Sequence, residues 1–396
     1  MPLDGMRILL VFGEAMAAPE VTWSLQDANA DVVIAFREGS RSPVRRLRGI
    51  TKIDVANPSQ SFDAAREDLE AVLESGDIDA VMPLEDPALV LLESIETGTP
   101  RVGPVGSQCG LAIDKRQQFE IAERVGFRVP AWQSWPDLDR SGAEPLDHDG
   151  LVVVKPALAG WTAENRFDRG SIWFAQDRQA ALRDLENTQP SSPMMVQRAV
   201  TGVGQGIFGV GDGRRCYSLS GHRRVRMMNP AGSGSSACVS RTLNADEIES
   251  ARRFIADSEW SGLFMLETLQ SKDGKVDWFM ELNGRPWGSL ALARRQGLEY
   301  PAWSAEFQLN ETVPPDRDGQ AGLTCRNLGR EIMHGLHLLK GNRGNAPNWP
   351  RWSERFGVLG WSPKHCWYNS SRRQPSFLLK EAAHTVGSRL FRKSRG

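Results

Sequence analysis

Short apolar runs alternate with amphipathic stretches over the first hundred residues of the chain. This alternation predicts strands joined by helices, and therefore an open, doubly wound parallel sheet of the α/β class. Ligands of such sheets bind beyond the carboxyl ends of the strands. No G-x-G-x-x-G follows the first strand, so a dinucleotide site is not expected there. The predicted strands are residues 6–12, 31–36, 52–55 and 79–84, and the predicted helices are 21–28 and 62–73.

Glu85 and Asp86 follow the last of these strands. They either face a substrate at the strand end or lie in an exposed loop, which is the commoner outcome.

Two lysines stand where a predicted element begins or ends. Asp114-Lys115 opens an amphipathic helix that reaches residue 125, so Lys115 lies at the positive end of that helix, where phosphate binds well. Lys155 ends an apolar strand over 151–156, and a lysine there must extend to solvent or find an anion. Residues 157–170 show few strand or helix signals and predict a loop that could close over a ligand.

Glycines and arginines mark the next strands. A short strand over 194–197 is followed by glycines at 202–206, where the backbone either approaches a ligand closely or forms a tight hairpin or bulge. His222, Arg224 and Arg226 lie two residues apart and are expected to share one face of a strand, either around an anion or on a solvated edge. Residues 230–236 predict a flexible loop, and helices are expected over 246–258 and 291–296.

A β-hairpin is predicted between residues 262 and 283, because Asp273-Gly274 separates two apolar runs. Glu281, Asn283 and Arg285 follow at spacings of two, so their side chains share one face. If the turn is centred on Gly274, Glu267 lies directly opposite Glu281, whereas a two-residue turn would shift the pairing by one.

Two carboxylates placed opposite each other destabilise a sheet unless a cation lies between them. Glu267, Glu281 and the amide oxygen of Asn283 are hard ligands that suit Mg²⁺ held jointly with substrate phosphates. Arg285 is a planar cation that suits phosphate or carboxylate. The alternative is an amphipathic hairpin with a solvated polar face.

The 396 residues predict two to three domains, and a formal net charge of −1 argues against a nucleic-acid partner. No run has the length and apolarity of a membrane span, and no signal-peptide pattern is present. The five cysteines are scattered and show no C-x-x-C spacing, which argues for a reducing cytoplasm and against a zinc site or a disulfide framework.

Periodicity weakens after residue 314 and returns over 376–392, where Leu379, Ala383, Val386 and Leu390 form a helical stripe within a basic segment. This helix either packs on the domain, the preferred interpretation, or lies on an anionic membrane surface.

The order of these motifs resembles the ATP-grasp superfamily of ATP-dependent carboxylate–amine ligases, and ELNGRPWGS at residues 281–289 is its most specific part. The resemblance covers roughly residues 6–310. It implies a Rossmann-like α/β domain over 1–105, two ATP-grasp subdomains over 106–192 and 193–312, the second carrying the metal site, and a C-terminal extension over 313–396.

The resemblance also implies ligands and roles. Lys115 and Lys155 would contact the ATP phosphates, and Arg285, with Arg224, would stabilise an acyl phosphate. The remaining implied ATP-binding residues are Gln197, Arg198, Ala199, Val200 and Gly204, and the implied Mg²⁺ ligands are Glu267, Glu281 and Asn283. Three features depart from the pattern: the loop after Lys155 is not glycine-rich, Gly284 stands where proline is usual, and the basic strand runs into Met227-Met228, where an acidic residue is expected.

The function expected from the resemblance is formation of an amide between a small-molecule carboxylate and an amine, with release of ADP and phosphate. Two alternatives are a carboxylase that uses bicarbonate, and a scaffold that binds ATP without turnover. Dimers are common in the superfamily, so a homodimer is one of the oligomeric states to be considered.

Overall fold

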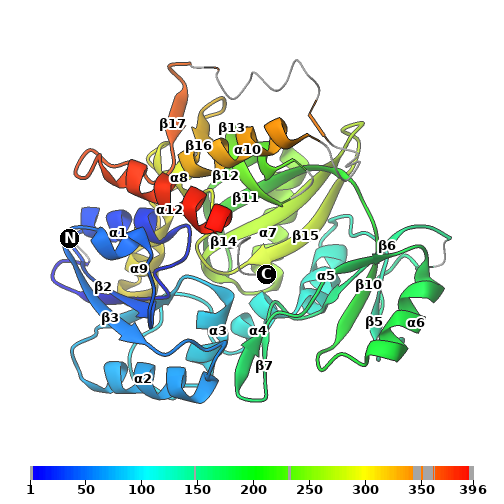
Figure 1. The fold of residues 1–396 in the computed structure, drawn as a ribbon, viewed down its shortest axis with the longest axis horizontal. Coiled ribbons are helices and arrows are strands. Elements are labelled where there is room, and N and C mark those ends of the chain that lie inside the picture. The colour runs from blue at the N-terminus through cyan, green and yellow to red at the C-terminus, as the bar shows by residue number, and fades with distance from the viewer. Residues whose placement is uncertain are drawn as a thin grey trace.

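The computed structural model describes residues 3–146, 149–230, 233–341, 349–350, 360 and 362–391. Within these residues the chain forms a parallel sheet, a small antiparallel sheet and a large sheet (Figure 1). No helix among them is long and apolar enough to cross a membrane.

The N-terminal sheet has four parallel strands in the order β3-β2-β1-β4, as the alternation of strands and helices predicts. Alternate residues of its central strand enter two different cores: Ile8 and Leu10 face one, and Leu9 and Val11 face the other. Both faces of the sheet are therefore covered. The strands are β1 (Arg7–Val11), β2 (Asp31–Arg37), β3 (Ile50–Val55) and β4 (Ala80–Pro83), and the helices are α1 (Ala18–Asp27), η1 (Pro43–Arg46), α2 (Phe62–Glu74) and α3 (Asp86–Glu93).

The small sheet has four antiparallel strands in the order β5-β10-β6-β9 and a hydrophobic core of its own, built with helix α6. Helices α4 and α5 precede it, and Asp114 caps α5 by accepting a hydrogen bond from the Arg116 backbone N–H. The elements are α4 (Ser107–Ile113), α5 (Lys115–Arg124), β5 (Trp132–Trp135), β6 (Val152–Pro156), β9 (Trp173–Ala175), α6 (Arg178–Thr188) and β10 (Met194–Arg198).

The large sheet has seven strands in the order β15-β14-β11-β12-β13-β16-β17. Asn244 and Glu247 form a reciprocal capping box at the start of α7, which confirms the predicted helix. The strands are β11 (Gly202–Asp212), β12 (Cys216–Asn229), β13 (Ser233–Arg241), β14 (Ser261–Ser271), β15 (Asp277–Asn283), β16 (Thr324–Arg326) and β17 (His365–Trp367), and the helices are α7 (Ala245–Asp257), α8 (Leu290–Arg294), α9 (Tyr300–Asn310), α10 (Leu328–Lys340) and α12 (Phe377–Phe391).

One hydrophobic core joins the N-terminal sheet to the large sheet. Ile8 and Leu10 of β1 share it with Phe208 of β11, Met265 of β14 and Trp287. These two sheets are therefore held together by apolar packing. The small sheet has one core with α6, and Trp132 and Met195 of its strands enter a second core that also contains Leu266 of β14.

Helix α12 packs on α10 and η1, in line with the preferred interpretation of the C-terminal segment. The predicted packing stripe is wrong, however: Leu379 is 66% exposed, and the buried side chains are Phe377, Glu381 and Ala382. Phe377 at the start of the helix packs edge-on against Trp23 of α1. The helix therefore docks through a face turned away from Leu379.

Candidate active site

The predicted hairpin is confirmed, and its register places Glu267 of β14 directly opposite Glu281 of β15. A register shift follows between Glu267 and Thr268, so the pairing beyond that point is offset by one residue. The turn contains Gly274 in the left-handed region with a φ of 71°. The two carboxylates therefore meet across the ladder, as the longer turn predicts.

Each of the two carboxylates has one polar partner. Arg224 of β12 donates from Nη2 to Oε1 of Glu267 at 2.6 Å, and the Asn283 amide donates to Oε1 of Glu281 at 3.2 Å. Burial raises the pKa of Glu267; the Arg224 charge opposes that shift and the Glu281 charge adds to it. Two acidic groups thus share a site with one directly paired cation.

Lys155 lies at the end of β6 and is only 8% exposed. Its ammonium stands 5.2 Å from the centroid of the Phe119 ring. The pKa of Lys155 is lowered to about 7, mainly by burial and also by the charge of Lys115, against an opposing effect of Glu281 and Glu267. Lys155 is therefore a desolvated cation within electrostatic range of the paired carboxylates.

Asp86 at the start of α3 binds Arg285, which resolves the question left open for the residues after β4. Arg285 donates from Nε to Oδ1 of Asp86 at 2.8 Å and from Nη2 to Oδ2 at 3.3 Å. Burial opposes ionisation of Asp86, but the charges of Arg285, Arg169 and Lys115 together hold its pKa below the usual value. The neighbouring Glu85 is half-buried and pairs with Arg37 at 2.6 Å.

The segment after β10 is tied into the small sheet. Gln197 is buried, the Arg198 backbone N–H donates to the Ala131 carbonyl, and the Ala199 N–H donates to the Leu151 carbonyl. An adenine ring at this segment would have to use other groups, such as those of Val200.

Gly204 of β11 lies under the Arg224 side chain. A Cβ atom at this position would come within 2.7 Å of Arg224 Cδ. This glycine therefore makes room for a guanidinium, and the close approach expected of the glycine run is an approach of Arg224.

The prediction of an irregular loop over residues 157–170 is wrong. The segment contains a two-stranded hairpin, β7 (Trp161–Ala163) and β8 (Arg166–Asp168), which docks on the N-terminal domain. Phe167 enters the core beneath α2, and the Phe62 backbone N–H donates to the Asn165 carbonyl. One apolar anchor residue thus orders a segment that lacks a clear strand pattern.

The predicted flexible loop over 230–236 is also wrong for its last residues, because Ser233 to Ser236 belong to β13; residues 231–232 lie outside the described part of the chain. Two register shifts on either side of Arg226 interrupt the alternation of β12. Arg226 consequently pairs with Glu331 at 2.7 Å and does not line the cavity that Arg224 faces.

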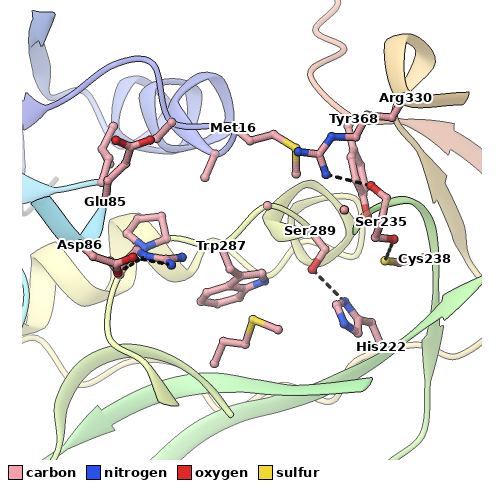
Figure 2. A pocket seen from close by; sticks show the side chains of 18 of the residues that line it. Met16, Glu85, Asp86, His222, Ser235, Cys238, Trp287, Ser289, Arg330 and Tyr368 are labelled. Atoms are coloured by element: carbon pink, nitrogen blue, oxygen red, sulfur yellow. Dashed lines mark hydrogen bonds and ion pairs between the residues drawn. The ribbon is translucent and has the colours of Figure 1, made fainter. Parts of the chain in front are cut away.

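A cavity of ≈ 320 Å³ opens beside Arg285 and Arg224, between the N-terminal sheet and the large sheet (Figure 2). His222, buried in its wall, is hydrogen-bonded to Ser289 at 2.8 Å, and its pKa is lowered to about 3, mainly by burial. The wall residues that sequence analysis missed come from the β1–α1 connection and from the C-terminal region: Ala15, Met16, Ala17, Arg330 and Tyr368.

The sequence contains a start signal for α10, the helix that carries Arg330. Asn327 caps α10, since its side chain accepts a hydrogen bond from the Arg330 backbone N–H. An asparagine before an amphipathic run is a start signal for a helix.

Gly284 stands where the resemblance predicts a proline, and the Trp260 ring fills the space beside it. A Cβ atom at 284 would lie 2.4 Å from the edge of the buried Trp260 ring and 3.0 Å from Ala112 Cβ. We expect Gly284→Ala to lower the free energy of unfolding by about 1–3 kcal/mol through overpacking. Chemical denaturation would measure this change.

Gly335→Ala is the matched control, because no atom lies within 4 Å of a Cβ atom there and the position is helical. We expect that variant to be unchanged or stabilised by up to about 1 kcal/mol. Equal stability of the two variants would contradict the steric role of Gly284.

The donor set of Glu267, Glu281 and Asn283 fits a hard divalent cation. Its two carboxylates face each other, and burial, with the Glu281 charge, raises the pKa of Glu267, an effect that a bound divalent ion would oppose. In the described part of the chain, no three His, Cys, Asp or Glu side chains gather closely enough to hold a metal ion, so the set depends on the Asn283 amide.

No protein-family model matches the sequence, and no curated protein matches it. Several solved structures share its fold at low identity. An L-amino acid ligase from Bacillus licheniformis is 14% identical with a TM-score of 0.56, over 78% of this chain and 75% of that one.

Two further structures extend the comparison. The N5-carboxyaminoimidazole synthetase from Staphylococcus aureus is 14% identical with a TM-score of 0.59, over 87% of this chain and 88% of that one. The biotin carboxylase domain of the Hydrogenobacter thermophilus 2-oxoglutarate carboxylase, in complex with MgADP and bicarbonate, is 14% identical with a TM-score of 0.60. The match covers 81% of this chain and 74% of that one. The chain therefore has the ATP-grasp fold that its sequence motifs resemble.

Proposed function

We propose that the protein is an ATP-dependent ligase that activates a carboxylate as an acyl phosphate and joins it to an amine. The observation that carries this proposal is the placement of Glu267 opposite Glu281. The charges of Lys155 and Arg285 act on both carboxylates. This arrangement combines a place for a divalent cation with cations for phosphate. The similar structures, which include an L-amino acid ligase and carboxylases, support ATP-dependent chemistry of this broad kind.

The residues divide between binding and chemistry. Lys115 at the start of α5 and Lys155 at the end of β6 would bind the phosphates of ATP, and the segment from Gln197 to Val200 would border the adenine. Glu267, Glu281 and Asn283 would hold Mg²⁺, which neutralises phosphate charge when bound.

Arg285 would stabilise the charge that develops on the transferred phosphoryl group, with Arg224 beside it. The substrate carboxylate oxygen would bond to the γ-phosphorus as the bond to ADP breaks, and the amine nitrogen would then displace phosphate and lose a proton. Asp86 orients Arg285 through two hydrogen bonds, so the guanidinium is positioned before the substrate arrives.

The test is ADP release with Mg-ATP across a panel of amino acids and other small carboxylates, each with and without a second amine. We expect release that depends on one acid–amine pair. Release that requires bicarbonate and no amine would instead indicate a carboxylase. Tight ATP binding without release under any mixture would indicate a scaffold.

A further inference from the structure

Arg330 is a cavity cation without a carboxylate partner. Its guanidinium extends from α10 toward Met16, and Nη1 donates to the Ser235 carbonyl at 2.9 Å (Figure 2). Within the described residues, its guanidinium forms no ion pair with a carboxylate. A guanidinium has five donors in a planar fork, so most of its hydrogen-bonding capacity remains available to a ligand.

The other cations of this cavity are paired. Arg224 binds Glu267 at 2.6 Å, and Arg285 binds Asp86 at 2.8 Å. Arg169 stands 3.8 Å from the same Asp86 carboxylate. Arg330 thus differs from every other arginine that lines the cavity.

The surroundings of Arg330 do not supply the missing charge. Burial is the main influence on its pKa, which is lowered, and the Arg389 charge acts in the same direction. Tyr368 and then Glu381 act in the opposite direction, but burial raises the pKa of Tyr368 well above its usual value, so its hydroxyl stays neutral. The Glu381 carboxyl accepts hydrogen bonds from Asn327 and Thr385, and burial raises its pKa. Arg330 borders two cavities, and Glu381 lines only the neighbouring one.

Desolvated cations are costly unless an anion compensates them. Arg330 lies across the cavity from Asp86 (Figure 2), and Arg285 binds that carboxylate. We propose that Arg330 binds a carboxylate or phosphate group of the organic substrate, distinct from the carboxylate that is activated near Arg285. The substrate class is therefore small molecules that carry a non-reacting anionic group. This assignment of the ligand as substrate rests on the proposed ligase function.

The test compares ligand pairs that differ only in one anionic group. Suitable pairs are L-glutamate with L-glutamine, O-phospho-L-serine with L-serine, and L-alanine with L-alaninamide. The first two pairs place the extra anion on an acid substrate, and the third places it on an amine substrate. Binding is measured as the rise in Tm of the full-length protein, which needs no ATP turnover.

For wild-type protein we expect the anionic member of at least one pair to bind more tightly than its neutral partner. Arg330→Ala should weaken binding of that anionic member by roughly 10- to 150-fold and leave the neutral partner unchanged. Arg330→Lys should restore part of the preference. Arg389→Ala is the matched control, since Arg389 lines only the neighbouring cavity, and it should keep the preference.

The outcomes separate this inference from the ligase proposal. Loss of the pair preference in Arg330→Ala supports the anion site even if no mixture releases ADP. A pair preference that survives in Arg330→Ala would overturn it, and so would a panel in which no anionic member binds more tightly than its partner. ADP release with unchanged selectivity in Arg330→Ala would overturn the anion site and leave the ligase proposal standing.

Discussion

Replacing Glu281 with alanine should abolish ATP turnover while the fold remains intact. Glu281 faces Glu267 across the hairpin and is one of the two carboxylates proposed to hold Mg²⁺. Its removal takes away a ligand at the point where phosphate charge must be neutralised, so we expect a loss of at least about 10²- to 10³-fold in ADP release. Steady-state assays at saturating acid and amine would measure this loss.

Stability should not fall with activity in this variant. Glu281 and Glu267 repel each other, so removing one of them relieves like-charge repulsion. We therefore expect the Tm of Glu281→Ala to equal or exceed that of the wild type. Glu249→Ala, in which an exposed carboxylate is removed from α7, should retain full activity. Wild-type turnover in Glu281→Ala would exclude this metal site.

The affinity for Mg-ATP should fall as the pH rises above about 7, because Lys155 loses its charge there. Burial lowers the pKa of Lys155 to about 7 in the free protein. Bound phosphates favour the protonated form, so the pKa rises in the complex and ATP binding takes up a proton at alkaline pH. The dissociation constant should increase by up to about tenfold per pH unit above 7 and level off below it.

Isothermal titration calorimetry in two buffers of different ionisation enthalpy would count the proton taken up at pH 8. Lys155→Met should bind ATP weakly and without this pH dependence, and it should not be destabilised, since a buried charge is replaced by an apolar chain of similar size. Lys275→Met, at the exposed turn of the hairpin, is the control. A constant affinity in wild-type protein between pH 7 and 9 would contradict the assignment of Lys155.

The features that the sequence predicts well are those set by local pattern. Alternation of strands and helices predicts the N-terminal sheet, and Asp273-Gly274 predicts the hairpin that brings Glu267 opposite Glu281. In the hairpin the interacting residues lie close in the chain. The turn and the side-chain alternation then suffice to place them.

The features that the sequence does not predict depend on contacts between distant segments. Residues 157–170 form a hairpin because Phe167 enters the core beneath α2, about a hundred residues earlier in the chain. The C-terminal helix buries Phe377 and not the stripe that contains Leu379, because the position of α1 and α10 decides which face is covered. Amphipathic periodicity alone does not contain that information.

Part of the candidate site also depends on contacts between distant segments of the chain. Asp86 and Arg285 are separated by 199 residues and meet only because the N-terminal sheet packs on the large sheet. Arg330 reaches the cavity from α10, an amphipathic helix that the sequence analysis does not predict, and its lack of a carboxylate partner is visible only once its neighbours are placed. Sequence motifs predict the residues proposed to bind phosphate and metal, but not the opposite wall of the cavity.

The core shared by β1, β11, β14 and Trp287 has a consequence for cooperativity. Ile8 and Leu10 would be exposed to water if the N-terminal sheet separated from the large sheet, so neither sheet can lose its structure without exposing the other. The two sheets therefore form a single unfolding unit. The small sheet is joined to this unit as well, because Trp132 and Met195 of its strands share a core with Leu266 of β14, so melting of the small sheet would expose apolar side chains of the large sheet.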